Sequence, residues 1–373
     1  MKKTTWWLLS AIISMVFIVI LVMLWVKMNQ YKVEPTQLVS EQAALAEIQK
    51  WDNTQTSPAT KIKTGIFIQS LQFFNSMEVN ISGYIWQHYQ NNVHDDIKPG
   101  KDEVGFIFPE QVNTGSIDPR EVYRVSSGDE EVIGWYFEAT LRQPFDYSVY
   151  PFDHKTVWVR MWAKDFSKNV ILIPDYKAYE ATGLEDIFGI EKSIVLGTWI
   201  RENTYFDYHT SNYDTNFGLD NYVGQSNFPE LQYNFVVKRK FKNAFIVYLL
   251  PLFLVAALLF AALLTVSENK NHAHKLGFSV AGFIGTSSGL FFVVMLAHIQ
   301  LREQFAGASI VYIELFYIFM YGLLVLATAN TFLFSIQASG LRNIILYKDN
   351  LIPKVAYWPV VFGSMILITL VVG

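Results

Sequence analysis

Apolar residues gather in four long runs within the last third of the chain. The runs cover residues 243–266, 276–301, 308–337 and 355–373. The only side chains in them that can carry a charge are His298 and Glu314. Each run approaches or exceeds the ~20 residues that span ~30 Å of hydrocarbon, and because lipid offers the backbone no hydrogen-bond partners, such runs must be helical. The pattern therefore predicts a four-helix transmembrane domain over residues 241–373.

A fifth apolar run, residues 6–26, lies near the start of the chain and follows Lys2 and Lys3. It is longer than the ~7–15 apolar residues of a secretory signal, and the nearest Ala-x-Ala sequence, at residues 44–46, lies roughly 20 residues too far downstream for cleavage. We interpret residues 1–30 as an N-terminal transmembrane anchor or uncleaved signal. A cleaved signal peptide is the alternative.

A polar stretch of about two hundred residues separates the N-terminal apolar run from the four C-terminal runs. This stretch is long enough to bury a core of its own. Alternating or β-rich segments occur at residues 62–71, 79–89, 132–141, 156–162, 169–174, 191–202 and 231–240. Turn residues such as Asn75-Ser76 and Gln143-Pro144 separate them, a pattern typical of an antiparallel β-sandwich. We expect the sandwich over residues 61–240, preceded by a linker and short helix over residues 31–60.

Charge and composition exclude several classes of function. The formal net charge is −4 and the chain has no cysteine, so nucleic acid is not an expected partner, and disulfides, thiolate metal sites and thiol catalysis are excluded. Common hydrolase and phosphate-binding motifs are missing. Ser287 and His298 are eleven residues apart in one run, about 16 Å along a helix, too far for a catalytic dyad. The sequence predicts neither an enzyme nor a cofactor.

The lysines and arginines near the membrane ends give the orientation only in part. If the N-terminus is inside, seven of these basic residues lie on each side of the membrane, so their number does not decide the orientation. The first segment usually dominates, and Lys2 and Lys3 before it place the sandwich outside the cytoplasm. We expect a multi-pass protein of the inner (plasma) membrane with an extracytoplasmic sandwich. The basic cluster Lys238-Arg239-Lys240 then stands on the outer side and needs a separate explanation.

Several motifs, and the order of the parts, resemble one family over residues 61–373: the pentameric ligand-gated ion channels, in their bacterial, cysteine-free form. The motifs are Tyr150-Pro151-Phe152-Asp153, Phe106-Ile107-Phe108-Pro109-Glu110 with Asn113, Tyr84-Ile85-Trp86 before Tyr89-Gln90-Asn91, Lys238-Arg239-Lys240 before a helix with Pro251, and Tyr312-Ile313-Glu314. The first is similar to the centre of the loop at the base of the family's extracellular sandwich. Animal members close that loop with two cysteines, where this chain has Gln143 and Val157.

The resemblance implies a homopentamer in which an arginine at the membrane junction pairs with the loop aspartate. Carried over to this chain, the pair is Arg239 with Asp153, and it would couple the sandwich to the pore. A basic cap near lipid headgroups is the alternative explanation of the cluster. The implied function is a ligand-gated channel for inorganic ions. The sequence does not determine whether the channel would select cations or anions. A non-conducting membrane-anchored sensor or scaffold of the same architecture is the alternative.

The family's ligand site lies between neighbouring sandwiches and is lined by aromatic residues, which attract cationic amines through their ring faces. By position, Trp162 supplies one wall, and Trp86 and Tyr89 come from the adjacent subunit. The capping segment supplies Tyr205, Phe206, Tyr208, Tyr213, Phe217 and Tyr222. The agonist would be a small molecule or a proton. Packing in the sandwich core is the alternative for each of these rings.

The helix over residues 276–298 is the expected pore lining. Residues at helical spacing on one stripe are Gly277, Ala281, Ile284, Ser288, Phe291 and Met295. A hydrophobic ring can close a pore by dewetting, so Ile284 and Phe291 are the candidate gates. The alternative is close helix packing, because Gly277, Ala281, Gly285 and Gly289 form a ridge of small residues.

Two weaker features could respond to ions. Asp214, Asn216 and Asp220 alternate around Gly218 and faintly resemble a calcium loop, but the twelfth position is Gln225 instead of glutamate, and an Asx-turn is the simpler interpretation. Five copies of His272 and His274 would form rings that titrate between pH 5 and 8, although histidines in loops are usually only solvated.

Overall fold

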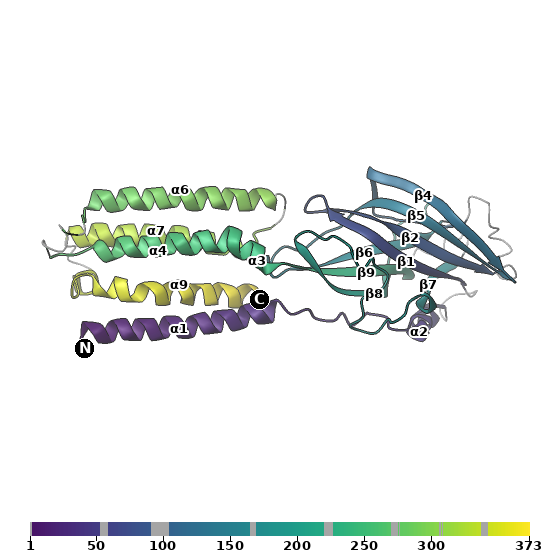
Figure 1. The fold of residues 1–373 in the computed structure, drawn as a ribbon, viewed down its shortest axis with the longest axis horizontal. Helices are drawn as coiled ribbons and strands as arrows, with labels where there is room; N and C mark the ends of the chain where they lie inside the picture. The colour runs from purple at the N-terminus through teal and green to yellow at the C-terminus, as the bar shows by residue number, and fades with distance from the viewer. Residues whose placement is uncertain are drawn as a thin grey trace. The chain divides into compact units, whose positions relative to one another are not determined.

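The computed structural model describes residues 2–52, 59–90, 104–164, 169–219, 227–269, 275, 277–305, 307, 309–336 and 342–373 (Figure 1). The chain forms two compact units. The helical unit comprises Met1–Gln30, Asp146–Asp153 and Arg239–Gly373, and the sandwich unit comprises Tyr31–Phe145 and His154–Lys238. The short segment Asp146–Asp153, which connects two strands of the sandwich unit, is therefore part of the helical unit.

The sandwich unit contains two sheets. One has the strand order β4-β5-β2-β1-β7 and the other the order β3-β6-β9-β8. The strands are β1 (Thr60–Phe73), β2 (Glu78–Gln90), β3 (Phe106–Ile107), β4 (Gln111–Ser127), β5 (Glu130–Arg142), β6 (His154–Ala163), β7 (Val170–Pro174), β8 (Trp199–Ser211) and β9 (Phe228–Arg239). The described pairs run antiparallel except β1 and β7, which are parallel, so the predicted antiparallel pattern holds for all but this edge.

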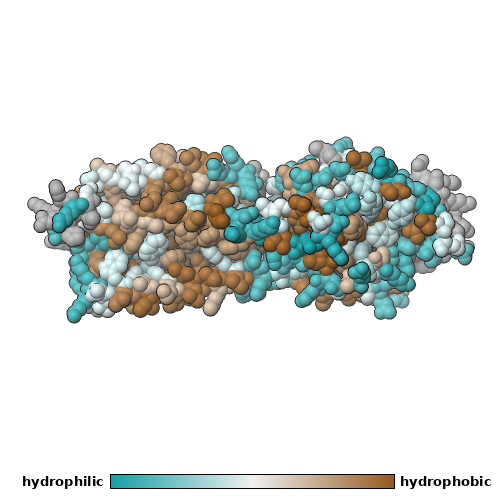
Figure 2. Space-filling model, viewed as in Figure 1, coloured by the Kyte–Doolittle hydropathy of each residue, from teal (hydrophilic) through white to brown (hydrophobic). Residues whose placement is uncertain are grey.

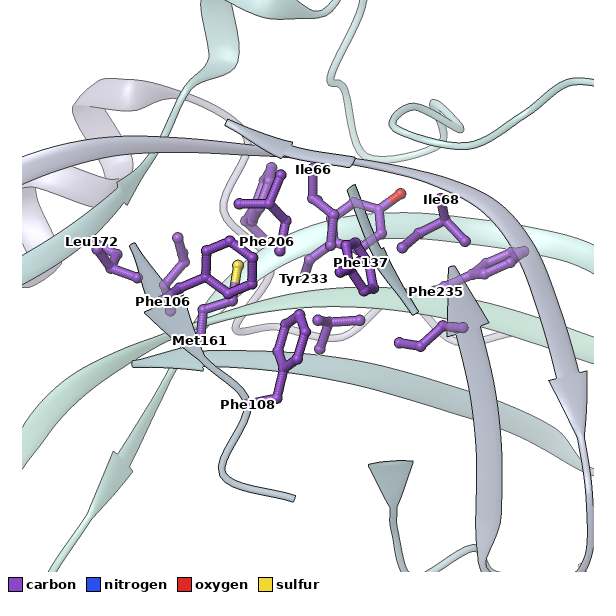
Figure 3. Packing of buried hydrophobic residues seen from close by; sticks show 14 of the residues in the cluster. Ile66, Ile68, Phe106, Phe108, Phe137, Met161, Leu172, Phe206, Tyr233 and Phe235 are labelled. Atoms are coloured by element: carbon purple, nitrogen blue, oxygen red, sulfur yellow. The ribbon is translucent and has the colours of Figure 1, made fainter. Parts of the chain in front are cut away.

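The core between the sheets follows from alternation along the strands. On β2 the odd-numbered residues Val79 to Tyr89 are buried and the even-numbered ones are not, as the two-residue period of a strand requires. Side chains from both sheets meet in one apolar cluster, which includes Ile66, Phe137, Met161 and Phe235 (Figure 3). This shared core makes the unit a β-sandwich.

Two strand boundaries differ from the sequence-based expectation. β4 has no counterpart among the predicted segments, because it is an edge strand whose side chains are mostly exposed and show no alternation. β8 begins at Trp199 instead of residue 191, and the residues before it form turns, one of them at Gly197 with a φ of +59°, where glycine is favoured.

The segment that follows the first helix belongs to the sandwich unit. Leu38 forms a β-bridge with Phe206, and α2 (Glu41–Asp52) begins where the Ser40 hydroxyl accepts a hydrogen bond from the Ala43 amide at 3.2 Å. α2 buries Ala44, Ile48 and Trp51, spaced as one helical face. The predicted short helix is therefore present.

The helical unit holds α1 (Lys3–Met28), α3 (Phe241–Ala244), η3 (Phe245–Leu249), α4 (Leu250–Thr265), α6 (Val280–Gln304), α7 (Tyr312–Ser335), α8 (Arg342–Ile345) and α9 (Leu351–Val372). Five helices in the described part of the chain are long and apolar enough to cross a membrane: Lys3–Met28, Phe241–Thr265, Val280–Gln304, Tyr312–Ser335 and Leu351–Val372. Apolar residues cover much of the visible surface of this unit (Figure 2). The length and composition of the five helices suit a multi-pass membrane protein.

Candidate functional site

The 146–153 loop holds an enclosed polar site of the helical unit. Arg239 Nε donates to Asp153 Oδ1 at 3.1 Å, and Arg239 Nη2 donates to Asp153 Oδ2 at 3.3 Å. The side chains are only 9% and 1% exposed, so this is a buried, two-point ion pair. The Arg239 guanidinium also lies over the Tyr150 ring, 4.7 Å from its centroid. The expected pairing of Asp153 with Arg239 is thus present, whereas its role in coupling stays a prediction.

Aromatic contacts fix the same loop among the helix ends. Phe152 stacks on Phe241 with centroids 5.0 Å apart, and Tyr150 packs on Phe305 at 4.6 Å. The backbone amide of Tyr312, at the start of α7, donates to the Ser148 carbonyl at 2.8 Å. The loop therefore contacts residues at the ends of α3, α6 and α7. Sequence reasoning did not identify Phe305, because nothing in its local sequence reports a partner 155 positions away.

The predicted pore stripe lies mostly on the outer surface of the helical unit. α6 begins at Val280, so Gly277 precedes the helix and has a φ of +64°. Ala281, Ile284, Ser288 and Phe291 are exposed and Met295 is half-buried. The helix buries one narrow stripe instead, formed by Phe283, Ser287, Leu290, Val294 and Leu301.

The residues that lie directly opposite the buried stripe can be placed from the ~100° turn per residue of an α-helix. They are Ala281, Gly285, Phe292, Leu296 and Ile299, and Ser288 lies at the edge of this face. Ile284 and Phe291 lie to one side. An open groove of ≈ 600 Å³ between α6 and α7 is lined by residues of both faces, among them Ile284, Ser288, Phe291 and Phe292, together with Leu324, Thr328 and Phe332. The predicted stripe thus includes residues of two neighbouring faces.

The expected aromatic ligand residues fall into separate groups. Trp162 and Tyr213 come together edge to face at 5.7 Å, and Phe217 joins them at 6.2 Å from Trp162 and 5.8 Å from Tyr213. These three rings, the 162/213/217 cluster, lie on an accessible surface, where Phe217 is 45% exposed. The structure thus brings together Trp162 and two residues of the predicted capping segment, Tyr213 and Phe217.

Charged groups lie directly beside this cluster. Arg160 Nη1 donates to Glu230 at 2.9 Å, Arg160 also pairs with Glu110, and the Tyr213 hydroxyl donates to Glu230 at 2.8 Å. Two carboxylates therefore surround one guanidinium, and Glu230 is 3% exposed. Burial, together with the bond to Glu230, raises the pKa of Tyr213 to about 12. The Arg160 guanidinium lies over the Trp162 ring, 5.8 Å from its centroid, so this ring already contacts a cation, and the exposed Phe217 ring is the one that suits an added cation.

The remaining predicted tyrosines are enclosed in the sandwich unit. Tyr89 is 1% exposed and donates to Gln87 at 2.6 Å. It lies three positions after Trp86 on β2, so the two side chains project to opposite faces of the strand. Tyr205 is 3% exposed. The Tyr208 hydroxyl donates to the Leu172 carbonyl at 3.1 Å.

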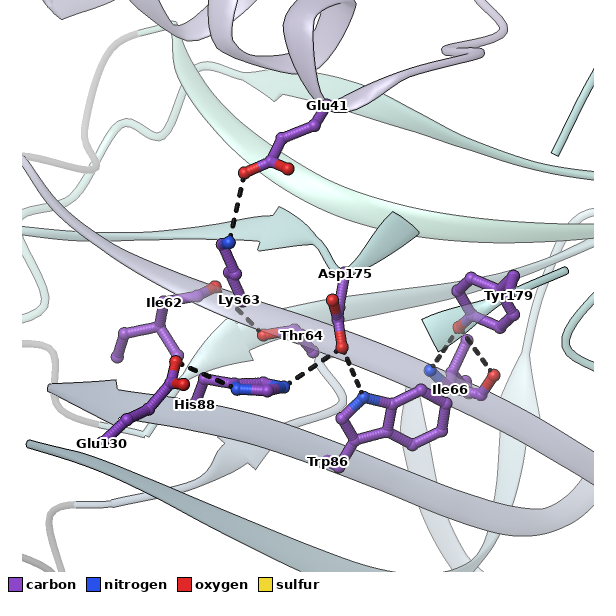
Figure 4. Close-up of polar contacts among 10 residues, drawn as sticks. All are labelled: Glu41, Ile62, Lys63, Thr64, Ile66, Trp86, His88, Glu130, Asp175 and Tyr179. Atoms are coloured by element: carbon purple, nitrogen blue, oxygen red, sulfur yellow. Dashed lines mark hydrogen bonds and ion pairs between the residues drawn. The ribbon is translucent and has the colours of Figure 1, made fainter. Parts of the chain in front are cut away.

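Trp86 belongs to a polar cluster on the face of the sheet away from the core (Figure 4). Asp175 accepts from Trp86 Nε1 at 2.9 Å and contacts His88 Nε2 at 3.1 Å, while His88 Nδ1 lies 3.1 Å from Glu130. The hydrogen bond to Asp175 raises the pKa of His88 despite partial burial. Sequence reasoning missed His88, although the two-residue strand period places it on the same face as Trp86.

The calcium interpretation remains a prediction. Asn216 Oδ1 accepts from the Gly218 amide at 3.0 Å, an Asx-turn, and Asp214 lies on the same exposed segment. Asp220, Tyr222, Gln225, His272 and His274 lie outside the described residues. Within the described ranges, no three histidine, aspartate or glutamate side chains are placed to hold a metal ion.

Comparison with known proteins found no match. No protein-family model matches the chain, and no curated protein matches it.

Proposed function

We propose that this protein is a homopentameric ligand-gated ion channel with an extracytoplasmic β-sandwich. The observation that carries the proposal is the 146–153 loop, which connects β5 to β6 of the sandwich unit yet packs as part of the helical unit. A segment shared in this way can transmit a change in the strands to the helices. The family resemblance of the motif at Tyr150 to Asp153 points in the same direction.

The transmission would pass through the Asp153–Arg239 pair. His154 and Lys238 are paired residues of β6 and β9, and Asp153 and Arg239 are their immediate neighbours in sequence. Arg239 also directly precedes Lys240 and the start of α3. A shift of the β6–β9 ladder would therefore move the buried ion pair and, with it, the beginning of the first pore-domain helix. A buried pair suits this role because its geometry is narrowly defined when both charges are desolvated.

The pore would be lined by α6. In its first half the outward face carries small or polar residues such as Ala281, Gly285 and Ser288, which gain little from contact with lipid tails alone. Further along, the same face carries Phe292, Leu296 and Ile299. Five copies around an axis would direct this face to a shared lumen. Ile284 and Phe291 remain the proposed hydrophobic gate, and Phe292, opposite the buried stripe and 57% exposed, is the competing gate position.

The agonist site would include the 162/213/217 cluster. A cationic amine is the favoured ligand class, because the rings lie beside the Glu110, Arg160 and Glu230 group and Phe217 is accessible. In the pentamer the Trp86 face of a neighbouring subunit would complete the site. A proton is the other agonist that the sequence analysis allows.

A non-conducting sensor or scaffold is the second candidate, and one observation favours it. A Cβ atom built on Gly285 or Gly289 would meet nothing within 4 Å. Both positions are therefore open to close packing with another helix, which would seal the bundle instead of lining a lumen.

Recording from purified protein in planar bilayers separates the two. We expect gated unitary currents when pH, calcium and a panel of amines are scanned. Ile284→Ala and Phe292→Ala are compared in parallel, and the true gate residue is the one whose truncation raises open probability without agonist. Silence from wild type and both variants, with pentamers verified in the membrane, would refute the channel and favour the sensor.

A further inference from the structure

The N-terminal helix is an integral part of the helical unit. α1 and α9 run side by side in the same direction: the Ser10 hydroxyl bonds to the Val355 carbonyl, Phe17 lies against Gly363, and Met28 lies against Gly373. A Cβ atom on Gly363 would approach Phe17 to 3.2 Å. Such close contact along the whole helix is more than a membrane anchor requires, because an anchor needs only apolar length.

Trp25, in the last turn of α1, reaches the 146–153 loop. Its ring lies 5.9 Å from Phe152 and 5.8 Å from Phe241, the two rings that stack on each other beside the Asp153–Arg239 pair. The indole therefore packs against both the loop and the first residue of α3. These distances lie in the range of favourable aromatic contacts.

A directional hydrogen-bond chain holds the indole in place. Trp25 Nε1 donates to the Tyr312 hydroxyl at 2.8 Å. The Thr369 hydroxyl donates to the Met365 carbonyl at 2.7 Å, so the Tyr312 hydroxyl must donate the 2.6 Å bond between these two side chains. The Tyr312 hydroxyl thus accepts a hydrogen bond from α1 and donates one to α9. The Tyr312 backbone amide donates a third hydrogen bond, to the Ser148 carbonyl of the loop.

We propose that α1 is a regulatory fifth helix, and that Trp25 is a positioning residue that holds the 146–153 loop on the helical unit. The regulatory consequence rests on the proposed channel function. In that channel, α1 would set how readily the loop moves and therefore how much agonist is needed. It would not alter the permeation path, because α1 contacts α9 and the loop while the proposed pore lies on α6.

The positioning role can be tested without any current. Because the chain has no cysteine, Ser148→Cys provides a unique thiol at a half-buried position of the loop, and its rate of maleimide labelling reports release of the loop. Trp25→Leu should raise the rate about five- to tenfold, as expected when one net hydrogen bond and ring contact are lost. Trp25→Phe, which keeps a ring, should raise it less. Trp7→Leu is the matched control, because Trp7 contacts only Phe260 among the ring contacts described, and should leave the rate unchanged.

The regulatory role is tested by titrating tetramethylammonium, as the cationic probe, against the channels in planar bilayers. Trp25→Leu should change the half-activating agonist concentration about five- to tenfold at constant unit conductance. A cysteine pair at Met28 and Gly373 should reverse part of the effect on oxidation, since a Cβ on Gly373 would lie 3.1 Å from Met28 Cγ, within disulfide reach.

Three results decide between the claims. Parental labelling rates in both Trp25 variants would overturn the proposal. Faster labelling with an unchanged agonist response would remove the regulatory role. Faster labelling in a protein that never conducts would uphold the role of Trp25 and refute the channel instead.

Discussion

Two aromatic loops of this chain differ sharply in their surroundings. The 146–153 loop is enclosed: Tyr150 and Phe152 are 2% and 3% exposed, and each packs on rings of the helical unit. The 212–219 segment, which follows β8, presents Phe217 to solvent at 45% exposure. Both loops lie beside a largely buried guanidinium–carboxylate pair, so the loops differ in the exposure of their rings and not in the burial of the pair. In the proposed channel, the enclosed loop would transmit the movement and the exposed segment would meet the ligand.

The largest expected effect comes from breaking the enclosed pair. Arg239→Ala leaves Asp153 buried without its partner, which should lower the free energy of unfolding by about 3–5 kcal/mol. Thermal or denaturant unfolding in detergent measures it. Lys238→Ala is the matched control, because Lys238 pairs with Glu202 at a more exposed position, and should cost less than about 1 kcal/mol. Equal losses in the two variants would contradict the comparison.

A pair of phenylalanine truncations sharpens the same contrast. Phe152→Ala removes a ring that is almost fully buried and should destabilise the protein by about 3 kcal/mol. Phe217→Ala removes an exposed ring and should change the unfolding free energy by less than about 1 kcal/mol. Comparable values in the same unfolding assay would show that the 212–219 segment is as structural as the 146–153 loop.

The 162/213/217 cluster should contribute to ligand affinity, although its exposed ring contributes little to the free energy of unfolding. Phe217→Ala and Trp162→Leu should weaken binding of a quaternary amine by about 0.5–2 kcal/mol, because each removes a face that attracts the cation. Tetramethylammonium titration by calorimetry is the measurement. Phe74→Ala removes an equally exposed ring, 47% accessible, and should leave affinity unchanged. If all three variants bind like wild type, the ligand site lies elsewhere.

The smallest expected effect concerns pH. His88 has a raised pKa in the folded protein, mainly through its bond to Asp175, so its stabilising contribution is complete below the unfolded pKa of about 6.5 and disappears as pH rises through the folded value. The stability difference between wild type and His88→Gln should therefore be largest in mild acid and shrink toward alkaline pH. A difference that grows with pH would contradict the assignment.

The elements that could be predicted from sequence are those with a strong period or a fixed length. The apolar runs match the membrane-length helices because hydrocarbon thickness sets their length, and β2 was recognisable because one face is buried. β4 was not, since an exposed edge strand has no alternating pattern. Apolar composition placed the start of the pore-lining helix at residue 276, four residues before α6 begins at Val280, because the Ser279 hydroxyl accepts a hydrogen bond from the Gly282 amide and so defines the N-cap.

Site residues divide in a similar way. Asp153 and Arg239 stood in recognisable motifs, so their pairing could be expected. The partners that enclose them could not, because Trp25 meets Tyr312 across 287 positions and no local pattern encodes such a contact. Tyr89 and Tyr205 carried the right chemistry for a ligand site, but aromatic side chains also fill sandwich cores, and only the strand register shows which way they project.

The most direct test of the account is a double-mutant cycle on the Asp153–Arg239 pair, read out as agonist-evoked open probability in single-channel recordings. Asp153→Asn, Arg239→Gln and the double variant are compared with wild type, and a coupling energy above about 1 kcal/mol with unchanged unit conductance is the predicted result. Additive effects, or channels that open normally in all three variants, would contradict a role for this buried pair in joining the sandwich to the pore.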